Sequence, residues 1–389
     1  MSSSIIQRFY LRVIGVVTVL GLQLFFISSA SFASPIPNRD ESAASGKSLV
    51  YTMTNPNGDN AIVAFERNTQ TGELTFFGTY PTGGRGTGSI LDSQSPLIVD
   101  PSGAFLIAIN PASNDISVMA IQPDGSLSLV GQPVPSRGIA PGSLAINRDR
   151  LYVANKGDAT TPPNYAGFRL NVDGSLTNVK RPFELAIGDN PTQILFNPAG
   201  NMLIGLRLGG RGVDCFRVKP TGRLRLLRQL NEQTGPFAGV FNPANDSQLI
   251  VGDARLPGAV SYTVSTGGDI RRISAISNAP ERAACWIVAN NTGTFYWISN
   301  TGSGTLSLFS LAANGELNLL SSHNTLAFGR LPFEIALDKD NRFLYELNVG
   351  NGGTIHALRL TASTANAGLE DIGAVAVNGG TPAGLVIVE

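Results

Sequence analysis

The chain has 389 residues, including 44 glycines and 23 prolines, and its 28 basic and 28 acidic side chains cancel. Many turn formers together with 42% hydrophobic residues favour an all-β protein of short strands over a helical one. The balanced charge argues against a nucleic-acid-binding protein, because such proteins carry a basic surface that neutralises phosphates.

The N-terminus resembles a secretory signal peptide. Arg8 and Arg12 precede an apolar run over residues 13–27, and small residues around Ala33 supply a cleavage site. The alternative is a retained membrane anchor, but this run falls short of the ~20 apolar residues that a spanning helix needs. We therefore expect a secreted or periplasmic protein that loses residues 1–33 and is not attached to a membrane afterwards.

Residues 34–47 are polar and rich in Pro and Ser, which is typical of a flexible leader. The rest of the chain, residues 48–389, is expected to form one domain. We expect Cys215 and Cys285 to be free, buried thiols, because a chain of this length can be stable on its core alone.

An internal repeat runs through residues 48–389. A turn of the form x-Gly-x-Leu, loosest at its last copy, recurs at Gly72, Gly125, Gly174, Gly222, Gly268, Gly315 and Gly368. Ahead of it, each unit carries two short apolar strands joined by a turn, as in SPLIVDPSGAFLIAIN at residues 95–110. The Asx-Pro and Asp-Gly pairs supply the backbone angles that hairpin turns require. Four antiparallel strands per unit, repeated seven times, predict an all-β, seven-bladed β-propeller.

The two ends of the repeat region complement each other. The first unit begins at residues 48–55 with what is the second strand of other units, and the chain ends with a surplus first strand at residues 384–388. We predict that these two segments pair in one composite blade, so that the ring closes without an exposed strand edge. A solenoid or a β-sandwich would not explain why one end lacks what the other has in surplus.

Charged side chains are expected on one face of this ring, in the loops that surround the axis. The second strand of a unit ends in Asn five times, but in Arg207 in the fourth unit and Asp253 in the fifth. Other charged residues predicted on this face are Arg211, Arg255, Lys156, Arg137, Glu281, Arg282, Arg330 and Glu334. They could form a solvated rim with weak ion pairs. They could instead form an axial pocket whose arginines bind carboxylate or phosphate groups.

The repeat resembles that of the seven-bladed β-propeller lactonases, a family that includes 6-phosphogluconolactonases and carboxymuconate cyclases. The resemblance rests on DPSGAFL (100–106), PDGSL (123–127) and the strand-end Asn, and spans about residues 48–389. It implies the propeller fold and, as activity, hydrolysis of a lactone or a muconate cyclase-like reaction.

The chain departs from this family at the positions that carry its activity. Members have Asp-Leu-Gly-x-Asp-Arg after the second strand of the fourth unit, and here Arg207 and Arg211 replace the two acids. The fifth unit opens with Gly-Pro-Phe-Ala at residues 235–238, without the Arg and His of the family, and Asp253 stands where members have Glu. A lactonase site in this chain would therefore be built from different residues.

Lactone hydrolysis needs a base that activates water and a donor that stabilises the oxyanion. Asp253 or Glu281 could supply the base, and Arg207 or Arg211 the donor. The remaining charged residues of this face would then bind the ligand, a small anion or sugar lactone. The alternative is a non-catalytic propeller that binds a carbohydrate or a protein partner.

Neither a cofactor nor a metal is expected. The chain lacks the G-x-S-x-G, H-E-x-x-H and C-x-x-C motifs, and its only two histidines are far apart in the sequence. We expect a monomer, because a closed ring has no free strand edge that would force association.

Overall fold

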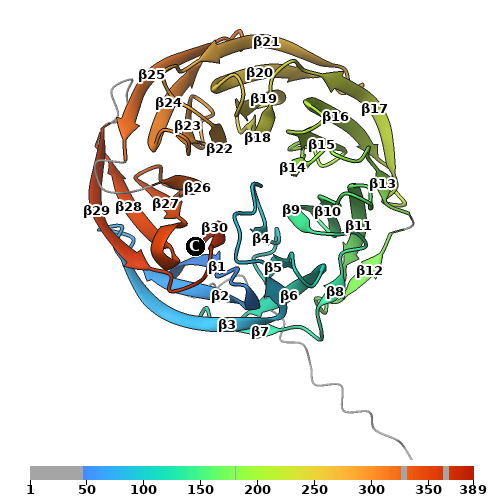
Figure 1. Cartoon of the computed structure of the whole chain (residues 1–389). Coiled ribbons are helices and arrows are strands. Elements are labelled where there is room, and N and C mark those ends of the chain that lie inside the picture. Colours follow the sequence, from blue (N-terminus) through green and yellow to red (C-terminus); the bar gives the residue numbers. More distant parts are fainter. Residues whose placement is uncertain (1–46, 180, 326–330, 362–367) are drawn as a thin grey trace, which may run out of the picture. The chain divides into compact units, whose positions relative to one another are not determined.

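The computed structural model describes residues 47–179, 181–325, 331–361 and 368–389. They form seven antiparallel sheets around a central axis, so the predicted seven-bladed β-propeller is confirmed (Figure 1). The predicted signal peptide, residues 1–33, and nearly all of the predicted leader lie outside the described residues.

Each blade runs from an innermost strand at the axis to an outermost strand at the rim. Blade 1 contains, in this order, β30 (Ala383–Val388), β1 (Ser48–Met53), β2 (Gly58–Arg67) and β3 (Leu74–Gly86). Blade 2 contains β4 (Leu97–Val99), β5 (Phe105–Asn110), β6 (Asp115–Ile121) and β7 (Leu127–Leu129). Blade 3 contains β9 (Pro141–Asn147), β10 (Arg150–Asn155), β11 (Asn164–Leu170) and β12 (Leu176–Asn178). Blade 4 contains β14 (Pro191–Phe196), β15 (Met202–Arg207), β16 (Gly212–Val218) and β17 (Leu224–Asn231). Blade 5 contains β18 (Pro236–Asn242), β19 (Asn245–Asp253), β20 (Gly258–Val264) and β21 (Ile270–Ser277). Blade 6 contains β22 (Ala284–Ala289), β23 (Phe295–Asn300), β24 (Thr305–Leu311) and β25 (Leu317–Asn324). Blade 7 contains β26 (Pro332–Leu337), β27 (Phe343–Asn348), β28 (Thr354–Leu360) and β29 (Leu369–Ala376). Two short strands, β8 (Val134–Pro135) and β13 (Phe183–Glu184), extend blades 2 and 3, and η2 (Gly350–Gly352) is a single 3-10 turn.

Blade 1 is built from both ends of the chain, as predicted. β30 pairs antiparallel with β1, with Leu49 opposite Val388 and Tyr51 opposite Val386. Next to this seam, the buried guanidinium of Arg67 donates hydrogen bonds to Ser48, Asp338 and Glu389. Strand pairing and this buried cluster together join the two ends.

The repeated glycine turns hold neighbouring blades together. The Tyr51 hydroxyl of β1 donates a hydrogen bond of 2.7 Å to the carbonyl of Gly125, in a turn of the next blade, and Tyr345 of β27 reaches Gly72 at 2.8 Å. Gly125 has φ +87°, and a Cβ there would lie 1.9 Å from Leu49 Cδ1. Both the backbone conformation and the close contact therefore require glycine in this turn.

The core lies between the blades. The second strand of a blade is almost wholly buried, as in β15, because both of its faces pack against neighbouring blades. Cys215 and Cys285 are free and buried, as predicted, and burial raises the pKa of Cys215 to about 11. No helix of the described part of the chain is long and apolar enough to cross a membrane.

The top face of the ring is defined here by the loops that follow the second strands and by the connections between blades. Antiparallel neighbours place both sets of loops on the same side. The strand-end asparagines lie there and join neighbouring segments. Asn55, for example, donates to the carbonyls of Ser89 and Thr381 at 2.9 and 3.0 Å.

Candidate functional site

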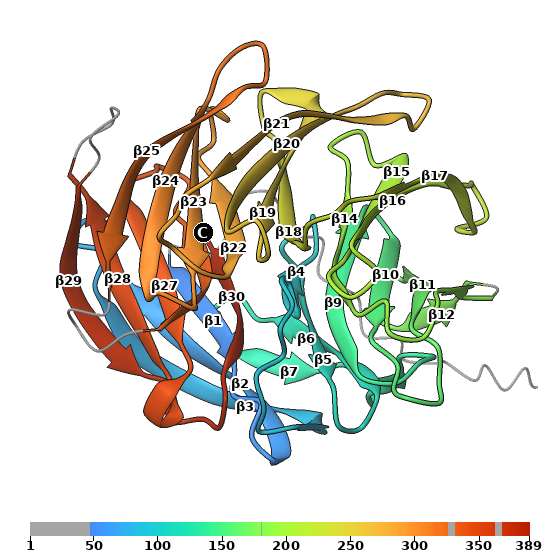
Figure 2. The same ribbon diagram turned by 45° about the horizontal axis from the view of Figure 1, so that its top comes forward.

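A loop of the chain occupies the centre of the ring. This axial loop, residues 89–95, connects β3 to β4 and runs among the innermost strands, and a second view shows it rising beside β4 (Figures 1 and 2). Its hydrogen bonds reach blades 3, 4, 6 and 7. The loop therefore occupies the axis, where one of the two alternatives from the sequence placed a ligand pocket.

Gln94 of the axial loop pairs with two innermost strands. Its backbone N–H donates to Thr192 of β14 at 3.0 Å. Its side-chain amide donates to the Ile287 carbonyl of β22 at 3.1 Å and accepts from the Ile287 N–H at 3.0 Å. An innermost strand has one unpaired edge, whose backbone groups need partners when they are buried. Gln94 supplies these partners as a further strand would.

Blades 3 and 6 hold the axial loop from opposite sides. The Ser93 hydroxyl donates to the Gly142 carbonyl at 2.8 Å, and the Trp286 indole N–H donates to the Ser93 carbonyl at 3.0 Å. Lys156 donates to the Asp92 carbonyl at 2.8 Å and also binds the Leu91 carbonyl. Burial lowers the pKa of Lys156 to about 8.

Glu334 of β26 links the axial loop to the closing strand. One carboxylate oxygen accepts a hydrogen bond from the Ser95 N–H at 3.1 Å, and the other from the Gly384 N–H at 2.9 Å. Its side chain is buried, and burial raises the pKa of Glu334 to about 8. Lys156 and Glu334, both predicted to bind the ligand, thus face the axis and bind the chain's own loop.

The raised pKa of Glu334 makes stability depend on pH. The folded chain keeps a proton that the unfolded chain releases above the ordinary carboxyl pKa, so the free energy of unfolding falls as pH rises toward about 8. The slope should approach about 1.4 kcal/mol per pH unit within this window. Lys156 adds nothing there, because its lowered pKa affects stability only above about 8.

We expect Glu334→Gln to flatten this dependence, since glutamine has no proton to release. Urea unfolding of both proteins at about pH 5, 6.5 and 8 measures the two slopes. Equal slopes in the wild type and the variant would contradict the assignment to Glu334.

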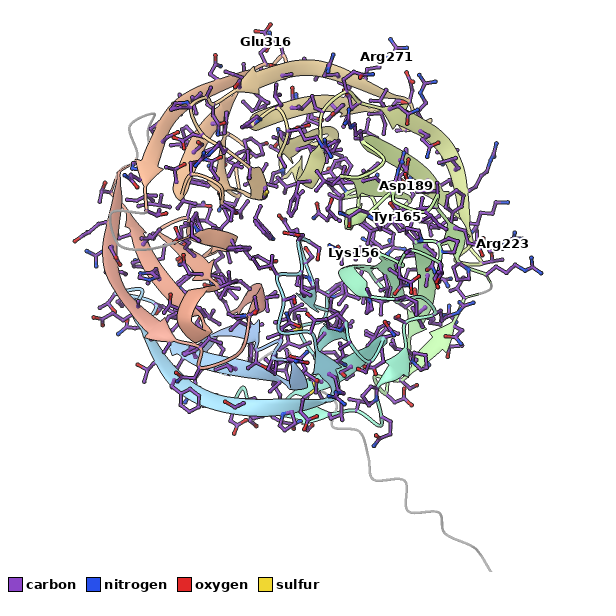
Figure 3. The ribbon with its side chains drawn as sticks, in the orientation of Figure 1. Lys156, Tyr165, Asp189, Arg223, Arg271 and Glu316 are labelled. Carbon is purple, nitrogen blue, oxygen red and sulfur yellow. The ribbon has the colours of Figure 1, made fainter. Side chains whose placement is uncertain are left out.

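Arg207 is held within blade 4. Its guanidinium donates to both carboxylate oxygens of Asp214, at 2.8 and 3.0 Å, and to Asp189 at 2.8 Å. Arg207 and Asp214 are buried. Asp189 lies near Tyr165 on the side of the ring that blades 3 and 4 form (Figure 3). All three guanidinium nitrogens of Arg207 are therefore already bound inside the protein.

Asp253 is fully buried and has one carboxylate oxygen anchored. Oδ1 accepts backbone hydrogen bonds from Gly235, Arg255 and Leu256, at 2.9, 3.1 and 2.8 Å. Oδ2 has no hydrogen-bond partner among the described residues. The pKa of Cys285 is raised, mainly because the thiol is buried and to a smaller extent because Asp92 and Asp253 are negatively charged. Asp253 is thus close enough to Cys285 to act on it, as is Asp92 of the axial loop.

The other predicted residues bind loops or face solvent. Glu281 accepts hydrogen bonds from the Ser303 and Thr305 hydroxyls at 2.6 and 2.5 Å, and Arg282 donates to the Gly302 carbonyl at 2.9 Å.

Arg137 donates to the Val179 carbonyl, away from the axis, and burial lowers its pKa. Arg211 and Arg255 are exposed, and Arg330 lies outside the described residues. The predicted residues that the structure describes are therefore dispersed over several blades.

The axial loop has a signature in the sequence, an unusually long connection between two units. From Gly72 to Pro96 the chain takes 24 residues. The equivalent glycine-to-proline spacing is 14 to 17 residues in the other units whose first strand begins at a proline. The extra length of this connection is what reaches the axis.

Residues 47–186 match the family described as Lactonase, 7-bladed beta-propeller. This stretch is similar in sequence to the seven-bladed lactonases. The resemblance noted from the repeat is confirmed for these residues. No curated protein matches the sequence of this chain.

Solved structures share the fold of this propeller. A candidate 6-phosphogluconolactonase from Bacteroides uniformis has a TM-score of 0.74 at 18% identity, over 88% of this chain and 99% of its own. A periplasmic gluconolactonase from Pseudomonas aeruginosa has a TM-score of 0.70 at 18% identity, over 88% of this chain and 99% of its own. At this identity the likeness shows a common fold, and the activity has to be argued from the site.

Proposed function

We propose that the chain is an exported lactonase-type propeller that binds a sugar lactone on the top face beside Asp253 and hydrolyses it. The family match over residues 47–186 supports a lactone as ligand. The fold shared with a gluconolactonase that is periplasmic supports export, in agreement with the signal peptide expected at residues 1–33.

The observation that carries this proposal is the asymmetry of the Asp253 carboxylate. Three backbone N–H groups hold Oδ1, which fixes the orientation of the side chain. Oδ2 is buried without a partner among the described residues. A buried acceptor of this kind requires a donor. A water molecule that is deprotonated for attack on a lactone, or a sugar hydroxyl, would supply it.

Arg255 is the arginine best placed to hold the anionic end of the ligand. It is exposed, and its side chain packs over Gly235, where a Cβ would lie 2.6 Å from Arg255 Cγ. Gly235 is also a backbone donor to Asp253. The guanidinium of the exposed Arg255, two residues after Asp253, can bind a carboxylate or phosphate bidentately.

A second function, binding without turnover, is favoured by a different observation. The axial loop fills the centre, and the guanidinium of Arg207, a predicted oxyanion donor, is bound to Asp214 and Asp189. In that case a carbohydrate or a protein partner would bind the top face and leave unchanged.

Hydrolysis of a panel of sugar lactones, their phosphorylated forms and muconolactones distinguishes the two functions. Loss of a general base lowers turnover by about 10²- to 10⁴-fold, so Asp253→Asn should be inactive while its circular dichroism is unchanged. Asp246→Asn, an exposed residue of the same strand, is the matched control and should keep its activity.

Each outcome of this experiment supports or overturns one of the two functions. Turnover that survives Asp253→Asn would overturn the assignment of the base. Absence of turnover, with sugar lactone or sugar acid binding that calorimetry detects in the wild type but not in Asp253→Asn, would establish the binding function instead. A folded wild-type chain that neither binds nor hydrolyses any member of the panel would overturn both.

A further inference from the structure

The balanced total charge conceals an uneven distribution around the ring. Residues 137–282, which contain blades 3 to 5, hold 18 of the 28 Lys and Arg but only 11 of the 28 Asp and Glu, a net charge of +7. The rest of the chain has 10 basic and 17 acidic residues, a net charge of −7. Blades 3 to 5 therefore attract anions although the whole chain is neutral.

Within this basic part, a groove of about 550 Å³ lies at the junction of blades 3 and 4. Three arginines line it: Arg150 at the start of β10, Arg169 in β11, and Arg223 in the turn before β17. Arg223 projects from the rim of the ring (Figure 3). This volume is within the range of about 300–1,000 Å³ that small-ligand sites occupy.

Two of these arginines are held in place. Asp149 accepts a hydrogen bond from Arg169 Nε at 2.7 Å and forms an ion pair with Arg150 Nε at 3.6 Å. Arg150 also donates to the Pro220 carbonyl at 2.7 Å. Since Arg169 donates to Asp149 through Nε, the edge of the guanidinium formed by its two terminal nitrogens can bind a ligand. Three arginines against one carboxylate leave an excess of positive charge in the groove.

Positive charge continues beyond the groove along the outermost strands. Arg225 and Arg228 are exposed on β17. Arg271 and Arg272 follow on β21 of the next blade, where Asp269 and Glu232 pair with them. A short anion would fill the groove alone, whereas a chain of regularly spaced anions could continue along this rim. The arrangement fits a polymer better than a single small molecule.

The lining of the groove favours a carbohydrate over the other common polyanions. Besides the arginines it presents Thr177, Asn178, Pro220 and Thr221, whose hydroxyl, amide and carbonyl groups suit sugar hydroxyls. Nucleic acids are commonly held by aromatic side chains on which bases stack, and no aromatic residue is among those lining the groove. Membrane surfaces are bound by an apolar face that inserts, which this polar concave groove does not offer.

We propose that this groove binds the carboxylate groups of an anionic polysaccharide of the polyuronate class. Arg169 and Arg223 bind successive carboxylates, and the rim arginines extend the contact. The site is separate from Asp253 and serves to hold the protein on its polymer.

The test measures binding of an oligogalacturonate to the intact protein by calorimetry. The double variant Arg169→Ala/Arg223→Ala should bind at least tenfold more weakly than the wild type. The control is Arg85→Ala/Arg359→Ala, which removes the same charge from arginines of blades 1 and 7, outside both the groove and the basic rim. Its affinity should stay within about twofold, and a neutral maltooligosaccharide should not bind.

Equal weakening in the two double variants would show that only general charge attraction is at work, and would overturn the proposal. Tighter binding of a single-stranded DNA oligonucleotide, or of anionic phosphatidylglycerol vesicles, than of oligogalacturonate would also overturn it. Because Arg169 and Arg223 belong to the groove of blades 3 and 4, whereas Asp253 ends β19 of blade 5, the lactone panel and this experiment can fail independently.

Discussion

A chain that ends at Gly380 is expected not to form the closed propeller. The truncation removes β30, so the buried strand β1 becomes an unpaired apolar edge. It also removes Glu389 from the buried Arg67 cluster and Gly384 from Glu334. An exposed, apolar edge strand is a template for aggregation. Size-exclusion chromatography and thermal unfolding should show an aggregated species without the cooperative transition of the full chain.

A synthetic peptide of residues 381–389 provides the control. Since main-chain hydrogen bonds can add a strand in trans, this peptide should restore a monomeric, cooperatively unfolding protein, whereas a scrambled peptide should not. A truncated chain that stays monomeric with an unchanged melting temperature would contradict the role of the seam.

Arg207→Ala is expected to destabilise the protein by about 3–5 kcal/mol, because it leaves the buried carboxylate of Asp214 without its counter-charge. Urea unfolding measures the loss. Arg359→Ala, which breaks an exposed ion pair with Glu370, should cost no more than about 1 kcal/mol and serves as the control.

The double variant Arg207→Ala/Asp214→Ala completes the cycle. It should be less destabilised than the sum of the two single variants, because no uncompensated carboxylate remains at position 214. A loss below about 1 kcal/mol for Arg207→Ala, accompanied by a loss of turnover, would instead favour the oxyanion role predicted from the sequence.

Some features of this protein were predictable because they repeat. The glycine turns of blades 1 to 6 all have a positive φ, and at Gly72 and Gly125 a Cβ would also meet a side chain of the neighbouring blade. The pairing of β30 with β1 followed from counting strands at the two ends. Neither prediction needed any knowledge of side-chain contacts between distant residues.

The candidate site was less predictable because it depends on departures from the repeat. Arg207 and Asp253 were singled out as exceptions among strand-end asparagines, yet the structure gives them opposite surroundings. Arg207 has its guanidinium bound by two acids, whereas Asp253 keeps one oxygen without a partner among the described residues. The position of a charge in the repeat predicts the face on which it lies, but not the groups that bind it.

By itself, the sequence determined the all-β class, the number of blades and the closure of the ring, because these follow from turn chemistry and from apolar strands that recur along the chain. Only the tertiary structure decided what fills the axis and where positive charge remains available. The axial loop is held by contacts such as Trp286 with Ser93, which are 193 residues apart, and the arginine groove forms where two blades meet. Such contacts depend on distances in space, and a repeat pattern carries no information about them.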